Sequence, residues 1–251
     1  MASSDQDPKS ADVKDDVKPE QPGDLLASIK KYYSSSEFSD LAVHTLDQDF
    51  KVHRVVVCGQ SEYFSRLFQG TWLEAKESEI HLKEDDPRAI EAMFQFMYGF
   101  EYDSSGSDQG RTSPMLLNVK VYQVAEKYQV RQLKDRAREK FKSIVEACWQ
   151  MDDFPVAIEE AYKRTTKEDR GLRDILVRTS QKHIEDLEAS EDFRLVLGGT
   201  AGFAADLIQV LVQDDVKKPG IKLKCNNCLV EYILETAYAK ATQFCPFCGA
   251  R

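Results

Sequence analysis

The stretch from residue 38 to residue 100 places the strongest limits on how this chain can fold. Leu41 and Val43 alternate with polar neighbours at the two-residue period of a half-buried strand. Phe50 and Val52 repeat that spacing after a short polar break. Two paired strands bury all four side chains on one face, so this part of the chain is predicted to form a small sheet.

Short helices and a third strand are predicted next. Apolar side chains gather at residues 55–58 and 63–68, and the sequence Gly-Gln-Ser at 59–61 predicts a break between two helices with a serine available as an N-cap. Ile80 and Leu82 alternate around a histidine, which predicts the strand. Strands interleaved with short helices indicate a compact α/β unit.

A longer helix closes this stretch. Asp86 can cap free backbone N–H groups, and Pro87, which has none, suits the first turn. Apolar residues then recur at helical spacing, which requires one buried face: Ile90, Met93, Phe94, Met97 and Tyr98.

Five short motifs occur in order along the same stretch: Phe38-Ser39-Asp40-Leu41, Val52-His53-Arg54, Ser61-Glu62-Tyr63-Phe64, Asp86-Pro87 and Tyr98-Gly99-Phe100. Together they resemble the recurrent features of a BTB/POZ domain. The resemblance implies an α/β BTB/POZ fold, mostly helical with a small sheet. It also implies a protein-interaction module, commonly a homodimer, that is not an enzyme.

Composition limits the remaining classes. The 251 residues can hold one good core with one or two small extra modules, and a hydrophobic content of 42% is ordinary for a globular protein. No run approaches the roughly 20 apolar residues of a membrane-spanning helix. The net charge of −9 does not favour nucleic acid as the main partner, because a duplex is itself densely negative.

The first 23 residues mix Asp, Lys, Pro and Ser with almost nothing to bury, so we expect a disordered tail. They lack the apolar core of a signal peptide and the Arg-rich, acid-poor character of a mitochondrial presequence. The expected location is therefore the cytoplasm, the nucleus or both. In a reducing compartment, metal binding is a commoner use of six cysteines than disulfide formation.

A helical stripe precedes the first strand: Leu25, Leu26, Ile29, Tyr32 and Tyr33. Such a helix can cover the core of its own domain. The BTB resemblance implies a second role, because longer family members use a helix here in the dimer interface. We therefore expect a homodimer with Leu25, Ile29, Tyr32 and Tyr33 at its interface.

Four regions are predicted in all. A BTB/POZ domain at 24–145 contains a flexible insertion, rich in Gly, Ser and Asp, at about 102–114. Residues 146–215 are expected to form a helical extension in which one long helix carries the apolar face from Leu172 to Leu187 and a later helix follows Thr200. Residues 216–251 form the last module.

That module carries the clearest chemistry. Cys225 and Cys228 are followed, after sixteen residues, by Cys245 and Cys248. Each Cys-x-x-Cys turn directs two thiolates at one ion, so the pair predicts a tetrahedral four-sulfur site for one Zn²⁺, with free thiols as the alternative. Strand-forming residues around the turns make the module resemble a zinc ribbon.

The predicted zinc is structural, because four cysteines leave no open position for water. From residue 217 onwards, six basic residues stand against two acidic ones, a net charge of +4. This surface suits either a protein partner or, less favoured, nucleic acid.

Three histidines bear on catalysis. His53 is expected to bond a backbone group or Asp40, and His44 and His81 are expected to lie on strands without a nearby acid. No nucleophile and base motif accompanies them, so an enzyme is not predicted.

The cullin-facing surface of BTB adaptors often includes an apolar-x-Glu element between the second helix and the third strand. Trp72-Leu73-Glu74 occupies that interval here. The resemblance therefore implies an adaptor that recruits an unknown protein substrate to a cullin ubiquitin ligase. The alternative is a nuclear scaffold or transcriptional regulator whose ribbon contacts nucleic acid or protein.

Overall fold

The computed structural model describes residues 24–69, 78–102, 113–217, 221–234 and 245–249. The predicted tail at 1–23, most of the predicted insertion and the Trp72-Leu73-Glu74 element lie outside these residues.

The predicted sheet is confirmed. Strands β1 (Leu41–His44) and β2 (Asp49–Val52) pair antiparallel, with Leu41 opposite Val52 and Val43 opposite Phe50. Strand β3 (Glu79–His81) lies parallel to β1, giving the order β2-β1-β3. A parallel neighbour requires a crossover connection, and helices α2 and α3 lie in that connection.

The break between α2 (Arg54–Gln60) and α3 (Glu62–Gln69) lies later than the sequence predicts, because α2 continues through Gly59 and Gln60. Ser61 makes the break with extended backbone. Its hydroxyl accepts a hydrogen bond from the backbone N–H of Phe64 at 3.1 Å and donates one to the carbonyl of Tyr128 at 2.6 Å. The serine therefore starts α3 and ties it to a distant helix.

Three helices form the centre of the molecule: α5 (Pro87–Met97), α6 (Pro114–Lys127) and α7 (Arg131–Cys148). The predicted cap of α5 is confirmed, since the Asp86 carboxylate accepts from the N–H groups of Arg88 and Ala89 at 3.1 and 3.3 Å. The predicted apolar face of α5 is buried, including Ile90, Met93 and Phe94.

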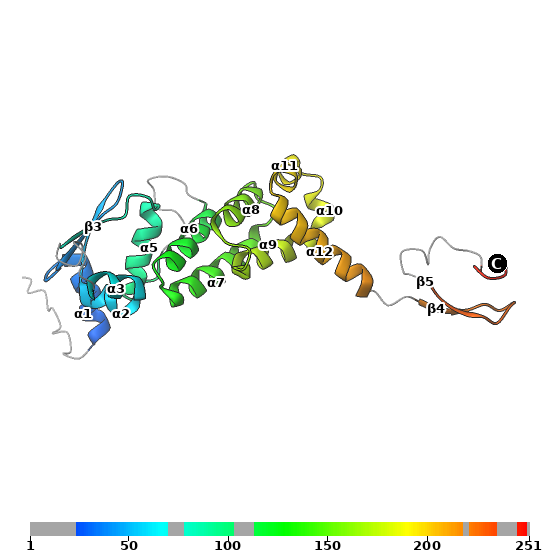
Figure 1. The fold of residues 1–251 in the computed structure, drawn as a ribbon, viewed down its shortest axis with the longest axis horizontal. Helices are drawn as coiled ribbons and strands as arrows, with labels where there is room; N and C mark the ends of the chain where they lie inside the picture. Colours follow the sequence, from blue (N-terminus) through cyan, green and yellow to red (C-terminus); the bar gives the residue numbers. More distant parts are fainter. Residues whose placement is uncertain (1–23, 70–77, 103–112, 218–220, 235–244, 250–251) are drawn as a thin grey trace, which may run out of the picture.

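Five further helices follow: α8 (Asp153–Arg164), α9 (Arg170–Lys182), α10 (Ile184–Leu187), α11 (Glu191–Gly199) and α12 (Ala201–Lys217). Figure 1 shows them continuing the row of α5, α6 and α7. One hydrophobic core runs from the sheet to α12. The helical extension therefore shares a core with the preceding unit.

One expectation about this region was wrong. The single long helix ends at Lys182 and a short one begins at Ile184, with the His183 ring between them stacked on Trp149 at 3.9 Å. Helix α11 was not among the predicted elements; Ser190 caps it by accepting from the N–H of Phe193.

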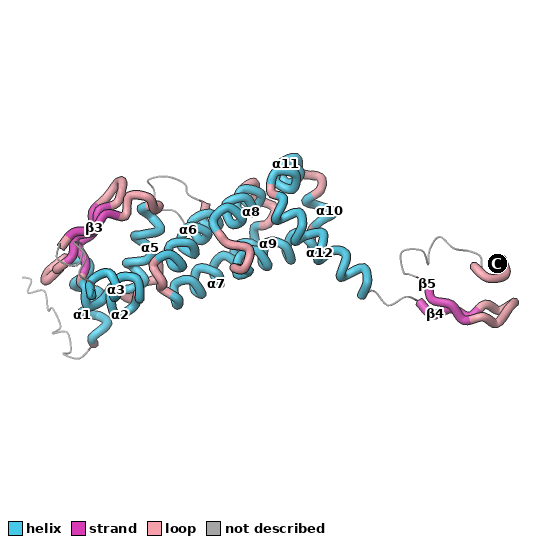
Figure 2. Tube along the Cα trace, viewed as in Figure 1, coloured by secondary structure: helices cyan, strands magenta, loops and turns pink. Residues whose placement is uncertain are grey.

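Two short strands, β4 (Ile221–Lys224) and β5 (Glu231–Leu234), pair antiparallel near the end of the chain. Figure 2 shows strands at both ends of the molecule and helices between them. None of the helices in the described part of the chain combines the length and the apolar content that a membrane span requires. Taken together, the segments Glu191–Gly199 and Ala201–Gln213 have the length and composition of a membrane span, but the two helices meet at a bend of 103°.

Asp169 links three helices and makes stability depend on pH. Its carboxylate caps α9 and accepts hydrogen bonds from the Tyr122 hydroxyl at 2.6 Å and from Lys134 Nζ at 2.8 Å. Burial raises the pKa of this carboxyl, but the bonds from Lys134 and Tyr122 outweigh burial and lower the pKa below its usual value. A depressed pKa stabilises the fold above the unfolded pKa of about 3.9, and this stability is lost as pH falls through the folded pKa.

We expect Asp169→Asn to lower the free energy of unfolding at pH 7 by about 1.5–3 kcal/mol, the usual value of a hydrogen bond to a charged group. The loss should begin to shrink as pH falls below about 3.9, because the unfolded chain then takes up a proton that the folded carboxylate still resists. Thermal melts followed by circular dichroism between pH 3 and 7 measure both effects. Asp152→Asn is the control, since Asp152 has no hydrogen bond or ion pair with any described residue. Equal losses at all pH values would contradict the role of the Asp169 charge.

Candidate interaction face and metal centre

Helix α1 (Leu25–Ser35) lies against the sheet end of the molecule. Asp24 caps it by accepting from the N–H groups of Leu26 and Ala27 at 3.0 and 3.3 Å. At its other end, Ser36 adopts a left-handed conformation and donates its N–H to the carbonyl of Tyr32. No residue of α1 is fully buried, so one side of the helix faces away from the protein.

The inward side of α1 contacts the core. The Tyr33 ring lies 4.6 Å from the Tyr98 ring and 5.8 Å from the Phe100 ring, and Ile29 is also partly buried. Burial and the charge of Glu91 raise the pKa of the Tyr33 hydroxyl. Ile29 and Tyr33 therefore attach α1 to its own domain, which is one of the two roles the sequence leaves open.

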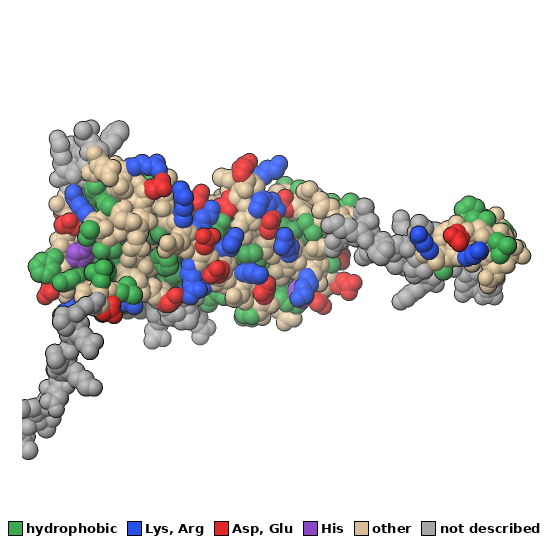
Figure 3. All heavy atoms as spheres, turned by 90° about the horizontal axis from the view of Figure 1, so that it is seen from below, with side chains coloured by type: hydrophobic (Ala, Val, Ile, Leu, Met, Phe, Trp, Pro, Cys, Tyr) green, Lys and Arg blue, Asp and Glu red, His purple; other side chains and the backbone are tan. Residues whose placement is uncertain are grey.

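The outward side belongs to an apolar face that we define by Leu25, Leu26, Phe38 and Val55. Leu25, Phe38 and Val55 are 72%, 81% and 80% exposed, so most of each side chain is open to solvent within one chain. Figure 3 shows hydrophobic side chains gathered at this end of the molecule. These residues border a groove of about 950 Å³ that also reaches Tyr32, His53 and Met97.

A histidine at the edge of this groove is fully hydrogen-bonded. The His53 backbone N–H donates to the Tyr98 hydroxyl at 2.8 Å, and ring Nδ1 lies 2.6 Å from the same oxygen. Ring Nε2 lies 2.7 Å from the carbonyl oxygen of Glu37. A neutral ring with its proton on Nε2 satisfies all three contacts. Asp40, the other expected partner, accepts instead from the N–H of Arg54 at 2.8 Å.

Gly99 lets α1 sit close to the domain. Its φ of +79° favours glycine, and a Cβ added there would collide with the Leu26 side chain. We expect Gly99→Ala to destabilise the protein by at least about 1–2 kcal/mol, the backbone cost of the left-handed conformation. Gly59→Ala is the control: it lies in α2 with nothing within 4 Å of an added Cβ, so it should be neutral or stabilising. Urea unfolding of both variants measures the difference, and equal stability would contradict the close approach.

The second candidate site is the cysteine cluster beside β4 and β5. The Sγ atoms of Cys225, Cys228, Cys245 and Cys248 all lie within 4.8 Å of one another. Cys225 Sγ is 3.6 Å from Cys248 Sγ, and Cys228 Sγ is 3.7 Å from Cys245 Sγ. Zn–S bonds of about 2.3 Å in a tetrahedron separate sulfurs by about 3.8 Å. The four side chains therefore fit one tetrahedral ion.

The backbone repeats the same turn at both Cys-x-x-Cys pairs. Leu229 donates its N–H to the carbonyl of Cys225, and Gly249 donates to that of Cys245, each at 2.9 Å. Both residues have left-handed backbones, with φ of +58° and +70°. Glycine adopts this conformation freely, whereas leucine pays about 1–2 kcal/mol. A strained leucine at the equivalent position indicates that the two turns are held in one common geometry.

Backbone N–H groups of Cys228 and Asn227 also point at Cys225 Sγ, at 3.5 and 3.4 Å. These donors lower the pKa of the Cys225 thiol, because they stabilise the thiolate. Thiolate is the form that binds metal. Four sulfurs complete the shell of such an ion, so this centre can hold a fold together and has no position for a reacting water.

The structure brings the four predicted cysteines together. The predicted interface residues of α1, in contrast, face in different directions. Leu25 points outward, Tyr33 packs inward, and Tyr32 lies between, with its ring 5.6 Å from that of Phe38. Sequence reasoning missed Phe38 and Val55 as surface residues. Phe38 belongs to the F-S-D-L motif and Val55 to an apolar run, so both suggested burial.

The expectation that His44 has no nearby acid was wrong. Its Nδ1 lies 2.7 Å from Asp49 and its Nε2 lies 3.8 Å from Glu79. The strand register explains this, because Asp49 stands directly opposite His44 in the antiparallel pair. His81 stands opposite in the parallel pair, and its ring stacks on that of His44 at 4.9 Å.

Comparison with known proteins identifies the domain that contains Phe38 and Val55 of the apolar face. The family model described as "BTB/POZ domain" matches residues 29–144. Ectromelia virus "Kelch repeat and BTB domain-containing protein 1" is 30% identical over 76 residues, 30% of this chain and 14% of the viral protein. "BTB and MATH domain-containing protein 42" of Caenorhabditis elegans is 28% identical over 127 residues, 50% of this chain and 29% of that protein.

The chain thus spans only a minor part of these two relatives. Among solved structures, the "BTB domain of zebrafish PATZ1" superposes with a TM-score of 0.37 and 16% identity over 47% of this chain and 89% of that one.

Proposed function

We propose, from the premise that residues 29–144 form a BTB/POZ domain, that this chain is a dimeric protein-interaction adaptor. The main support is the apolar face formed by Leu25, Leu26, Phe38 and Val55. These side chains are too exposed to be part of the chain's own hydrophobic core. Contiguous exposed apolar surface of this kind marks a protein interface. A second copy presenting the same face would cover it symmetrically.

The finer proposal is that the adaptor recruits a protein substrate to a cullin ubiquitin ligase, in the cytoplasm, the nucleus or both. Its basis is the resemblance of Trp72-Leu73-Glu74 to the apolar-x-Glu element of cullin-binding relatives. A Trp beside an acid suits an interface, because Trp gives a large buried area and is enriched at binding hot spots.

Binding of the full-length chain to a panel of purified cullins tests this proposal. We expect one cullin to bind the wild type and to bind the Trp72→Ala/Glu74→Ala variant at least about tenfold more weakly, the loss typical of a hot-spot pair. The matched control is Lys83→Ala/Glu84→Ala, two exposed residues just after β3. Failure of every cullin to bind, or equal binding by the two variants, would overturn the cullin assignment while leaving the dimer untouched.

We infer that the cysteine cluster holds one structural zinc ion per chain. The sulfur separations and the two matching turns support this assignment, and the zinc-ribbon resemblance accords with the β4–β5 hairpin. Zinc would supply four bonds that a two-stranded hairpin needs, because such hairpins are marginally stable alone.

A second candidate function, nucleic-acid contact by the hairpin, is favoured by one observation: Lys222 and Lys224 are exposed on β4. Lys224 faces Glu231 at 3.9 Å, which partly offsets its charge. Binding of labelled DNA or RNA that weakens steeply with salt, and is lost in Lys222→Ala/Lys224→Ala, would favour this function. The acidic total of −9 favours the adaptor.

A further inference from the structure

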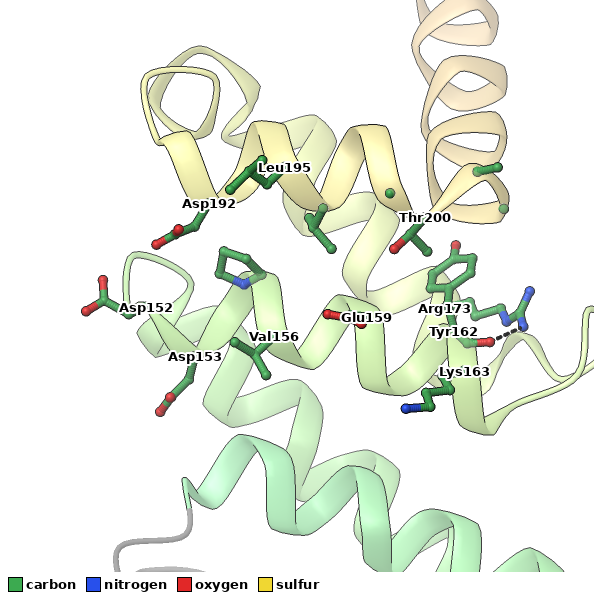
Figure 4. A pocket seen from close by; sticks show the side chains of 15 residues that line it. Asp152, Asp153, Val156, Glu159, Tyr162, Lys163, Arg173, Asp192, Leu195 and Thr200 are labelled. Carbon is green, nitrogen blue, oxygen red and sulfur yellow. Dashed lines mark hydrogen bonds between the residues drawn. The ribbon is translucent and has the colours of Figure 1, made fainter.

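A groove of about 920 Å³ lies between α8 and α11, far along the helical row from the sheet (Figures 1 and 4). Its apolar lining includes Val156 on α8 and Leu195 on α11, which are 44% and 66% exposed. Pro155 and Val196 also line the groove and are buried. The groove thus has an apolar lining with two apolar side chains accessible from solvent.

Carboxylates gather at one end of this groove. Asp152 and Asp153 lie at the start of α8 and Asp192 at the start of α11, and Figure 4 shows the three side chains at the same end. Glu159 lines the middle. Among the described residues, none of these four carboxylates has a hydrogen bond or ion pair.

Helix-start positions account for part of this arrangement, because acids near a helix N-terminus are stabilising. They do not account for Glu159, which lies in the second turn of α8. The two basic residues of the lining, Lys163 and Arg173, lie at the other end of the groove in Figure 4. Arg173 is used within the chain, because its guanidinium donates to the carbonyls of Tyr162 and Thr165.

We propose that this groove binds a segment of a partner protein in which Lys or Arg side chains adjoin an apolar side chain. The apolar side chain would cover Val156 and Leu195, and the cations would meet Asp152, Asp153 and Asp192. Charge complementarity selects this occupant, because an acidic or purely apolar segment would leave the carboxylates partly desolvated and unpaired.

A small organic ligand fits less well. Small-molecule sites fix their ligand with convergent, partly buried polar groups. Every buried polar side-chain atom in the described lining already has a hydrogen-bond partner, so the groove has no buried polar group free to fix a small ligand. The groove lies apart from the apolar face of α1, so this binding stands or falls independently of the proposed dimer and of cullin.

Panning phage-displayed random 12-residue peptides on the full chain tests the proposal. We expect the recovered peptides to carry Lys or Arg within three positions of Leu, Ile, Phe or Met. Synthetic copies with a fluorescent label then give affinities by anisotropy at two salt concentrations. Binding should weaken about tenfold in Val156→Asp/Leu195→Asp and about fivefold in Asp153→Asn/Asp192→Asn, and it should weaken as salt rises.

A charge-matched variant distinguishes binding in the groove from non-specific attraction of basic peptides to an acidic protein. Glu185→Gln/Asp186→Asn removes two exposed acids from the first turn of α10, outside the groove, and should leave the affinity unchanged. Thermal melts verify that all variants fold. Equal weakening by the two neutralised pairs, recovery of acidic or uncharged peptides, recovery of none, or retained binding by the Val156→Asp/Leu195→Asp variant would each overturn the proposal.

Discussion

Replacing Cys225 and Cys245 together by serine is expected to release about one zinc ion per chain and to unfold the β4–β5 hairpin. The double substitution removes one ligand from each Cys-x-x-Cys turn. Zinc binding to small structural sites contributes about 10–16 kcal/mol, and that binding energy is folding energy. No described residue of the hairpin contributes to the main hydrophobic core, so the helical body should keep its melting temperature.

Metal analysis by mass spectrometry and NMR spectra of the hairpin amides measure these two effects. The matched control is Cys58→Ser/Cys148→Ser, which changes the two cysteines that lie outside the cluster and should retain the metal. Wild-type protein with no bound zinc, or a Cys225→Ser/Cys245→Ser variant with the same zinc content, would contradict the site. A fall in the main melting temperature would contradict the independence of the hairpin.

The cysteine cluster shows how much local spacing can predict. Two residues between paired cysteines set a turn of fixed size, and the turn fixes where both thiols point. The four predicted residues are therefore the four that the structure brings together. The left-handed backbone of Leu229 was not predictable, since leucine does not favour that conformation.

The apolar face shows where such reasoning ends. Periodicity identified the apolar stripe of α1, but it does not say which members face the core. Tyr33 and Leu25 lie two helical turns apart, and only packing against Tyr98 separates their roles. The prediction for His44 was wrong for a similar reason, because its contact with Asp49 follows from the strand register. Residue alternation predicts the two strands but does not determine which residues stand opposite each other.

Replacing Leu25 and Val55 together by aspartate is expected to convert a dimer into a monomer. Both side chains are more than two-thirds exposed within one chain, so the change should leave the protomer folded. In a symmetric dimer the substitution places four carboxylates in one apolar interface, and each buried, unpaired charge costs several kcal/mol. We expect the dimer dissociation constant to rise at least about a thousandfold, which is about 4 kcal/mol.

Light scattering after size exclusion gives the mass directly, and the expected change is from twice 28.6 kDa to 28.6 kDa. Charged substitutions at Tyr33 would not separate the two roles of α1, because they would also break its contact with Tyr98. The control is Leu46→Asp/Met151→Asp, which places the same charges on two exposed apolar residues outside the groove that the apolar face borders. A monomeric wild type, or equal masses for the two variants, would reject the apolar face as the dimer interface, because only burial between copies makes a charge at Leu25 or Val55 more costly than one at Leu46.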